Sequence, residues 1–496
     1  MKRLILMAAG TSLLIAASLL ACALLPERYA VNAPIVNQMF GWFGEDAPPS
    51  DFFGSRIRVA SGFSIGLFAD GLPGVRFLRP LRSGALLATT PRDGRVWRLS
   101  PDTSGDGRSD TAVPLLENLN RPHGLDIYED WLYVAEGDGI GRVRIDADTG
   151  EIEGSYQRIV DGLPSGGNHW TRTVRFGPDG WMYVSVGSSC NVCFEQDDRR
   201  AALLRFRPDG SKAETVATGL RNTVGFDWQP ETGTLYGTDN GRDLLGDDFP
   251  PCELNRLEAG AFYGWPVANG HSIPDPDLGT GQEVRIRASI PPVHTFGAHT
   301  APLGMVFLNH PGLPKEWRGT ALVALHGSWN RTKKSGYKVV SLHWEANGAI
   351  VERDFAVGFE EAEDVIGRPV DVAEGFDGTI YVSDDYASAV YWVKHGAGDA
   401  HLLAEGPMSP GSVAPQTTGS ADAGAALWAR HQCEQCHGSA SAERDAANIP
   451  LPDLNARFDV ASLADLLSAP NPPMPLFSLD VQERYDLEAY LLSRIE

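Results

Sequence analysis

The chain repeats one short unit six times, and this repeat restricts the fold more than any other feature of its 496 residues. Each copy has a small turn, an apolar strand with alternating side chains, a second turn and another strand. The apolar strands lie in residues 83–90, 130–136, 179–186, 232–239, 319–325 and 377–384. Alternating strands repeated at roughly 50 residues are typical of propeller blades. The sequence therefore predicts a mainly β protein with a six-bladed β-propeller over residues 50–400, and the long interval between Leu235 and Leu322 predicts an elaborated loop over its top face.

A second, smaller domain is indicated by Cys433-Glu434-Gln435-Cys436-His437. A C-x-x-C-H run marks covalent attachment of c-type haem, with Cys433 and Cys436 bound to the haem and His437 as the proximal iron ligand. We expect Met474, in the run Pro-Pro-Met-Pro, to be the second iron ligand, because a His/Met pair raises the reduction potential and suits an electron acceptor.

Helical patterns flank the haem motif, at residues 421–432 before it and residues 479–495 after the methionine loop. This arrangement resembles class I cytochrome c, which implies a small all-α domain over residues 421–496. Residues 401–420 are rich in Pro, Gly, Ser and Thr and read as a flexible linker.

The first 25 residues combine a basic start, Lys2-Arg3, with an uncharged apolar run. This pattern is typical of a signal peptide, and the run is also long enough for a membrane anchor. Cleavage, an uncleaved anchor and lipidation at Cys22 all stay open. Each of them places the body of the protein in the periplasm, or facing outward and tethered to the membrane.

Charge and cysteine content exclude some classes of partner. The formal charge is −22, from 64 acidic and 42 basic residues, which argues against nucleic-acid binding. Besides Cys22 and the haem pair, the chain has Cys190, Cys193 and Cys252, whose pairing the sequence leaves open.

Several Arg- and His-containing segments lie at the ends of blade strands, where their side chains can gather in one central funnel. A lone histidine is usually structural, so the evidence for a functional site comes from these arginines and histidines taken together. Together they would form a pocket for a planar polyanion. Its candidate members are Arg121, His123, His169, Arg221, Asn222, His299, Arg331 and Arg368.

These segments carry a family resemblance. They read GGNHWTRTVRFGPDG, GLRNTVGF, DNGRDLLGDD, NRLEAGAFYGWP, HTAPLGM and ALHGSWNR, in this order. The region from about Ser61 to Val393 resembles the glucose/sorbosone dehydrogenase family of pyrroloquinoline quinone (PQQ) enzymes, especially its L-sorbosone or pyranose dehydrogenase branch. The resemblance implies PQQ and Ca²⁺ as cofactors, and a C-terminal cytochrome c is a partner known in that family.

The resemblance also implies roles for single residues. His169 would be the catalytic base that takes the proton of the anomeric hydroxyl while the hydride moves to PQQ. Arg221 would polarise the accepting carbonyl. Asn222 would contact the quinone, and His299, Arg331 and Arg368 would bind PQQ. Backbone carbonyls of Gly241 and Arg242 would hold the Ca²⁺.

Three positions depart from the family pattern. Ser188 stands where soluble glucose enzymes have an Asp that orients the catalytic histidine. Arg242 replaces the proline of a Gly-Pro pair, and Thr223 replaces the proline of an Arg-Asn-Pro run. Separately, residues 102–110 resemble a calcium loop but lack the bidentate Glu, with Val113 in its place, so an ordinary polar turn is an equal alternative.

The combined prediction is an exported PQQ-dependent dehydrogenase that oxidises an aldose, a pyranose or a sorbosone-type aldehyde. Its electrons would pass to the fused haem and then to a downstream cytochrome or terminal oxidase. A propeller lactonase and a non-enzymatic electron-transfer or binding module are the alternatives. Which sugar is used depends on loops such as residues 269–295.

Overall fold

The computed structural model describes residues 27–32, 56–345, 347–396, 420–431, 433 and 481–493. The chain divides into two compact units, residues 1–411 and residues 412–496, and this boundary falls inside the segment expected to be a linker. Each unit is described below by itself.

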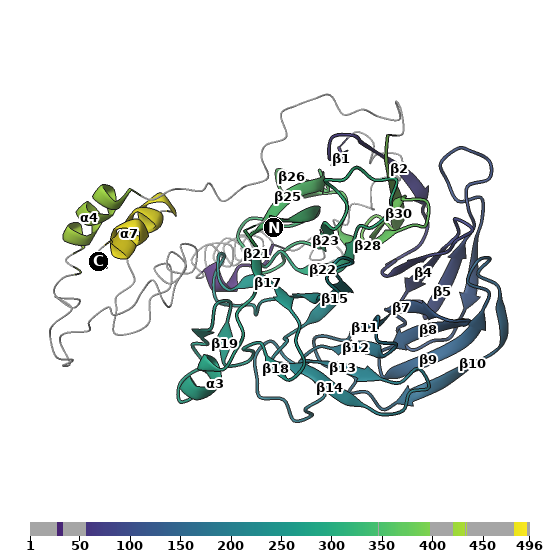
Figure 1. Ribbon diagram of the computed structural model, residues 1–496, viewed down its shortest axis with the longest axis horizontal. Helices are drawn as coiled ribbons and strands as arrows, with labels where there is room; N and C mark the ends of the chain where they lie inside the picture. Colours follow the sequence, from purple (N-terminus) through teal and green to yellow (C-terminus); the bar gives the residue numbers. More distant parts are fainter. Residues whose placement is uncertain are drawn as a thin grey trace, which may run out of the picture. The chain divides into compact units, whose positions relative to one another are not determined.

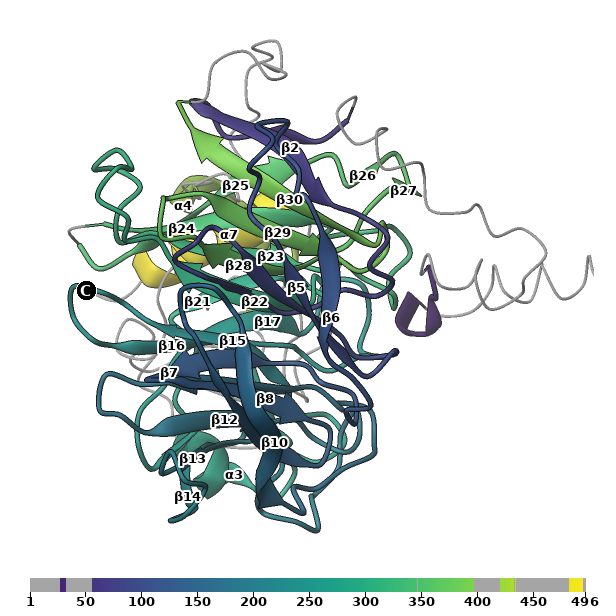
Figure 2. The ribbon, with the colours of Figure 1, turned by 90° about the vertical axis from the view of Figure 1, so that its right-hand side faces the viewer.

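The first unit is a six-bladed β-propeller, as predicted (Figures 1 and 2). Each blade is an antiparallel sheet of four strands in chain order, and one strand from the N-terminus completes the last blade. The first three blades are β3 (Leu78–Pro80) to β6 (Ala112–Leu116), β7 (Leu125–Tyr128) to β10 (Ile152–Asp161), and β11 (Arg172–Phe176) to β14 (Glu214–Thr218). The other three are β15 (Thr223–Trp228), β16 (Leu235–Asp239), β17 (Pro251–Arg256) and β21 (His294–Ala298); β22 (Pro302–Phe307) to β25 (Ile350–Val357); and β28 (Pro369–Glu374) to β30 (Ala389–His395) with β2 (Phe63–Ala69).

The ring is closed by strands from opposite ends of the propeller sequence. β2 pairs antiparallel with β30, where Phe63 lies opposite His395, and Figure 1 shows the two strands side by side. β1 (Arg58–Val59) likewise adds to the outer edge of β25. This pairing removes an exposed sheet edge and ties the first blade strand to the last.

The second strand of most blades is buried on both faces. Every residue of β4 (Leu86–Thr90), β12 (Met182–Val186), β16, β23 (Ala321–Leu325) and β29 (Ile380–Asp384) is buried. Neighbouring blades pack face to face, which covers both sides of each of these strands.

Aspartates on alternate blades link the inner strands of the ring. Asp126 on β7 accepts the backbone N–H of Phe176 at 2.7 Å. Asp227 on β15 makes the same bond to β22 at 2.9 Å, and Asp371 on β28 makes it to β3 at 2.9 Å. Each carboxylate therefore aligns its own inner strand with the next one, and the N-terminal ends of these strands carry the candidate site.

The long interval between Leu235 and Leu322 holds additional elements, as expected. β18 (Ala261–Phe262) extends the third blade by parallel pairing with β14. A small hairpin of β19 (Ala268–Asn269) and β20 (Ile273–Pro274) follows, and then the short helix α3 (Glu283–Arg287). A further small hairpin, β26 (Glu360–Glu361) and β27 (Asp364–Val365), precedes the last blade.

The described part of the second unit is a pair of helices. α4 (Ala421–Arg430) begins after Ser420, whose hydroxyl accepts the backbone N–H of Ala423. α7 (Val481–Ser493) packs against it, with Leu487 and Leu491 buried. Cys433 is buried too, whereas Cys436, His437 and Met474 lie outside the described residues, so the haem site stays a prediction.

The N-terminal expectation also falls outside the described part, because residues 1–26 do not belong to it. The short 3₁₀ helix η1 (Glu27–Tyr29) precedes Asn32, whose backbone N–H bonds to the carbonyl of Trp329 on the propeller at 2.8 Å. Within the described ranges, none of the helices is both long and apolar enough to cross a membrane.

Candidate active site

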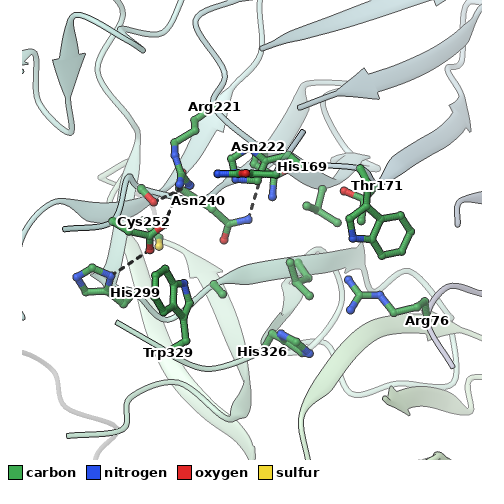
Figure 3. A pocket seen from close by; sticks show the side chains of 17 residues that line it. Arg76, His169, Thr171, Arg221, Asn222, Asn240, Cys252, His299, His326 and Trp329 are labelled. Atoms are coloured by element: carbon green, nitrogen blue, oxygen red, sulfur yellow. Dashed lines mark hydrogen bonds and ion pairs between the residues drawn. The ribbon is translucent and has the colours of Figure 1, made fainter. Parts of the chain in front are cut away.

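The loops that precede the inner strands meet around a cavity of about 220 Å³ (Figure 3). Its wall is rich in nitrogen-bearing side chains from several blades. The polar and aromatic members are Arg76, Asn168, His169, Trp170, Thr171, Arg221, Asn222, Asn240, Asp243, His299, His326 and Trp329. An adjoining cavity of about 230 Å³ shares Arg76, Trp170 and His326 and adds Arg368 and Asp385. The sequence prediction of one Arg/His-rich funnel is consistent with this arrangement.

His169 is held in one orientation by Ser188. Its Nδ1 lies 3.1 Å from the Ser188 carbonyl oxygen and 2.8 Å from the Ser188 hydroxyl. A carbonyl oxygen only accepts hydrogen bonds, so Nδ1 carries the proton in the neutral ring. Nε2 is then an unprotonated acceptor on the far side of the ring from Ser188. His169 lines the cavity, and this tautomer is the one that a proton acceptor needs.

The surroundings also keep the His169 ring neutral. Burial is the main cause, and the positive charge of Arg221 adds to it, so that the pKa of His169 falls from 6.5 to about 3. The negative charge of Asp243 opposes this shift. At neutral pH His169 is therefore unprotonated, which a proton acceptor requires.

Arg221 is buried, and the protein uses all five of its N–H donors. Nε donates to the carbonyl of Asn191 at 3.0 Å, and Nη1 donates to the carbonyls of Asn240 and Gly241 at 3.2 and 2.9 Å. Nη2 donates to Oδ1 of Asn191 at 2.8 Å and to Asp243 at 2.9 Å. The guanidinium is thus fixed at the wall of the cavity, and it must give up one of these bonds to donate to a bound molecule.

Two amide oxygens at the cavity wall have no hydrogen-bond partner among the described residues. They are Oδ1 of Asn222 and Oδ1 of Asn240. Asn240 is only 9 % exposed, and its Nδ2 donates to the carbonyl of Asn222 at 3.2 Å. Buried acceptors without partners are costly, so these two oxygens fit a ligand that brings a donor or a cation.

Gly241 and Arg242 differ from what a calcium site requires. The carbonyl oxygen of Gly241 already accepts a hydrogen bond from Nη1 of Arg221, whose positive charge would lie beside an ion bound there. The Arg242 guanidinium points away into a buried ion pair with Asp275, at 2.6 Å, and also contacts Asp277 at 2.9 Å. Gly241 therefore does not fit Ca²⁺ in this arrangement.

A second network of charges lies where the two cavities meet. Arg76 donates to Asp385 at 2.8 Å, and Asp385 accepts Nε2–H of His326 at 2.9 Å. Arg368 donates to Nδ1 of His326 at 3.0 Å. Both nitrogens of His326 are thereby used, so this histidine has no lone pair left to act as a base. Burial and then the charge of Arg368 lower the pKa of His326 to about 4.

Arg76 and Arg368 together carry more positive charge than Asp385 neutralises. Burial opposes ionisation of Asp385, but its contacts with His326 and the two arginines keep its pKa far below the usual range. With His326 neutral, two guanidinium groups face one carboxylate. The region therefore retains a net positive charge that suits a polyanion.

Trp170 forms an aromatic wall of the same cavity. The guanidinium of Arg121 lies over its ring at 4.6 Å, and that of Arg76 lies 6.0 Å away. His123 contacts the ring edge with centroids 5.6 Å apart. His123 itself is fully buried and does not line the cavity, while Arg121 is exposed on the outer side of Trp170. Arg121 and His123 therefore contact the Trp170 ring and would act on a ligand only by positioning that ring.

Of the two remaining candidates, His299 lines the cavity and Arg331 does not. His299 lines the cavity, donates Nε2–H to the carbonyl of Gly246 at 2.7 Å, and lies 3.6 Å from Asp243. Arg331 is not part of the cavity wall, because its guanidinium bonds the carbonyl of Asp247 and the carboxylate of Asp248. The alignment in this loop predicts a cofactor contact that the geometry does not show.

Several site residues were missed by the sequence reasoning. Arg76 and Asp385 belong to the networks above but stand in none of the quoted motifs, and Asp243 stands in DNGRDLLGDD without being singled out. Their side chains matter only because loops from different blades converge. A disulfide joins Cys190 and Cys193, which answers the open question of pairing, and the thiol of Cys252 lies buried at the cavity wall.

The loop of residues 102–110 is closed by its own hydrogen bonds. Asp102 accepts the backbone N–H groups of Gly105 and Gly107 at 2.7 and 2.8 Å. Asp110 accepts bonds from Thr103. The loop shows the internal bonding of a polar turn.

Comparisons with known proteins agree with this architecture. Residues 131–392 match the family "Glucose / Sorbosone dehydrogenase". An uncharacterized protein of Borreliella burgdorferi is 28% identical over 357 residues, covering 69% of this chain and 91% of the relative. A pyrroloquinoline quinone-dependent pyranose dehydrogenase of Coprinopsis cinerea is 24% identical over 414 residues, covering 69% of this chain and 55% of the relative. The holo PQQ domain of the C. cinerea pyranose dehydrogenase has a similar fold, with a TM-score of 0.58 and 23% identity over 68% of this chain and 97% of the domain.

Proposed function

Because the chain belongs to the glucose/sorbosone dehydrogenase family, we propose that it is a PQQ-dependent sugar dehydrogenase. The substrate is an aldose or pyranose oxidised at its anomeric carbon, or a sorbosone-type aldehyde. The cofactor named for the C. cinerea relative supports PQQ. When bound, PQQ would supply the acceptor for the hydride that leaves the sugar carbon with both electrons.

The observation that carries the proposal is the state of His169. Among the described histidines that line the cavity, His169 has its Nδ1 proton assigned by a carbonyl and its Nε2 left as a neutral acceptor. His326 lacks such an acceptor, because Arg368 and Asp385 use both of its ring nitrogens. His169 would therefore remove the hydroxyl proton of the sugar.

The binding residues for the cofactor follow from charge. PQQ carries carboxylates on a flat ring system, and the two adjoining cavities offer the guanidinium groups of Arg76 and Arg368 and the flat indole of Trp170. Asn222 and Asn240 present unused oxygens that can accept a ligand N–H. Arg221 would stabilise negative charge at the opposite wall, beside His169. The described residues thus fit a planar polyanion.

The proposal also covers the metal ion, the electron acceptor and the location of the protein. Ca²⁺ is implied by the family resemblance alone, because Gly241 does not fit the ion in this arrangement. Electrons would leave through haem c on Cys433 and Cys436, with His437 and Met474 as iron ligands, and pass to a downstream cytochrome or terminal oxidase. The Cys190–Cys193 disulfide supports a periplasmic or outward-facing location, because disulfides persist in oxidising compartments.

The test uses the full-length protein with its haem attached. PQQ and Ca²⁺ are added, and the haem α-band is followed while a panel of aldoses and sorbosone is supplied. Haem reduction that requires both PQQ and a sugar supports the dehydrogenase and its electron route together. Reduction of an added dye but not of the haem would retain the dehydrogenase and remove the haem route. No reduction of either acceptor, with lactone hydrolysis instead, would favour the lactonase alternative.

A further inference from the structure

The Cys190–Cys193 disulfide closes a four-residue ring that lies beside both proposed catalytic residues. The ring belongs to the irregular segment between β12, which ends at Val186, and β13 (Ala202–Phe206). A segment without strand hydrogen bonds has many accessible conformations, and a short covalent ring removes most of them.

The ring reaches His169 through Ser188. The Ser188 side chain is fully buried, and its hydroxyl donates to the carbonyl oxygen of Cys190 at 2.8 Å. With its proton committed to Cys190, the Ser188 oxygen faces His169 Nδ1 as an acceptor at 2.8 Å. The Cys190 carbonyl therefore sets the direction of this bond, which acts on His169 Nδ1 together with the Ser188 carbonyl at 3.1 Å.

The ring reaches Arg221 through Asn191, which lies between the two cysteines. The carbonyl of Asn191 accepts Nε–H of Arg221, and its Oδ1 accepts Nη2–H. The same Oδ1 accepts the backbone N–H of Asp243 at 2.8 Å, and Nδ2 of Asn191 donates to the Asp243 carbonyl at 3.0 Å. One residue of the ring thus holds the guanidinium and its counter-ion together.

Ser188, which contacts His169, also bonds directly to the backbone of Arg221. Its backbone N–H donates to the carbonyl of Arg221 at 2.8 Å. Displacement of the ring would move the partners of His169 and Arg221 at once. Further bonds of the segment join the Ser189 carbonyl to the N–H of Asn168 at 2.9 Å and the Asn191 carbonyl to Nε1–H of Trp265 at 3.2 Å. Glu195 accepts from the N–H and the hydroxyl of Ser189.

We infer that the Cys190–Cys193 ring is a redox-sensitive clamp, in which Ser188 and Asn191 are positioning residues for His169 and Arg221. Two electrons from a dithiol cleave the S–S bond to two thiols, and the dithiol closes to its own disulfide. The opened segment then no longer holds the Nδ1–H tautomer of His169 or the two Asn191 bonds of Arg221. The expected effect on turnover rests on the proposed function, whereas the effect on the tautomer does not.

The test compares the full-length protein with its Cys190→Ser/Cys193→Ser variant. Misplacement of the catalytic groups is expected to lower kcat by about 10- to 100-fold, with a smaller change in KM. Phe194→Ala is the matched control, because this side chain is 47% exposed beside the ring and makes none of these hydrogen bonds. The control should retain the kcat of the parent protein.

A second readout does not need the cofactor. Imidazole ¹⁵N spectra of the histidine-labelled protein without PQQ, assigned with His169→Gln, should show one Nδ1–H tautomer for His169. The serine variant, and the folded parent protein after reduction by a dithiol with two new titratable thiols, should show mixed tautomers. The reduced parent protein replaces the variant if the latter does not fold.

The outcomes separate the two proposals. Loss of the single tautomer without any sugar oxidation in the parent protein would support the clamp and reject the dehydrogenase. Parent-like kcat and an unchanged tautomer after opening of the ring would overturn the clamp and leave the dehydrogenase standing.

Discussion

Nδ1 of His169 lies 3.1 Å from the carbonyl oxygen of Ser188, so a backbone acceptor takes the place of the aspartate expected at this position. A carboxylate would add a negative charge and raise the pKa of the imidazole. The Ser188 carbonyl orients the ring without that charge, which agrees with the low pKa of His169. Orientation and basicity are therefore controlled by different groups in this site.

Replacement of His169 by Gln should abolish most of the sugar oxidation. Loss of a positioned base is expected to reduce kcat by about 10²- to 10⁴-fold. The affinity for PQQ should change little, because the cationic residues described at the adjoining cavity supply the positive charge that would bind its carboxylates. Steady-state kinetics with a dye acceptor and a PQQ titration check both statements, and a variant with parent-like kcat would remove His169 from the mechanism.

Replacement of Arg368 by Ala should weaken PQQ binding. Loss of a charge-assisted hydrogen bond to a carboxylate is expected to raise the Kd by about 10- to 100-fold. Arg353→Ala is the matched control, because Arg353 is an exposed arginine on the outer strand β25. Fluorescence titration of the two variants with PQQ measures the difference. Equal affinities would place the cofactor elsewhere in the funnel.

Stability should fall as the pH is lowered from about 6.5 towards 3, and His169 should contribute to this fall. The pKa of the folded-state imidazole is lowered from 6.5 to about 3, so the unfolded chain takes up a proton in this window that the folded protein does not. The contribution of His169 to the free energy of unfolding is fully present above pH 6.5 and is lost as the pH falls towards 3. Urea unfolding of the parent protein and of His169→Gln at pH 7 and pH 5 should show a smaller loss for the variant. An identical loss in both proteins would contradict the low pKa.

Arg242→Ala should destabilise the propeller rather than alter the chemistry. The Arg242 side chain is 4 % exposed and its partner Asp275 is 0 % exposed, so truncation leaves a buried carboxylate without its counter-ion. The expected cost is about 3–5 kcal/mol in the free energy of unfolding. The double variant Arg242→Met/Asp275→Leu should recover much of that loss in urea unfolding. A double variant no more stable than Arg242→Ala would argue against the ion pair as the cause.

A side chain at Gly424 should disturb the helix pair of the second unit. A Cβ at this position of α4 would overlap the backbone oxygen of Asp486 on α7. Gly424→Leu is expected to cost about 1–3 kcal/mol through overpacking. Hydrogen exchange in residues 421–430 and 481–493 measures the loss of packing. Ala426→Leu, on the exposed face of α4, should leave the exchange rates unchanged.

The sequence by itself determined the six blades, because each carries its own turn and apolar strand and these local signals recur along the chain. It also pointed to His169 and Arg221, which stand in long motifs, and to Arg368, which stands in a short Gly-Arg-Pro run. It did not reveal that the central strands are buried on both faces, since burial depends on the neighbouring blade.

Only the tertiary structure decided which histidine can act as a base. His169 and His326 both stand in family motifs, so the sequence does not distinguish them. The partners that assign their protons come from other loops: Ser188 for His169, and Arg368 and Asp385 for His326. A hydrogen bond depends on distance and direction between groups far apart in the chain. The repeat pattern therefore predicts the scaffold, and the convergence of its loops determines the chemistry.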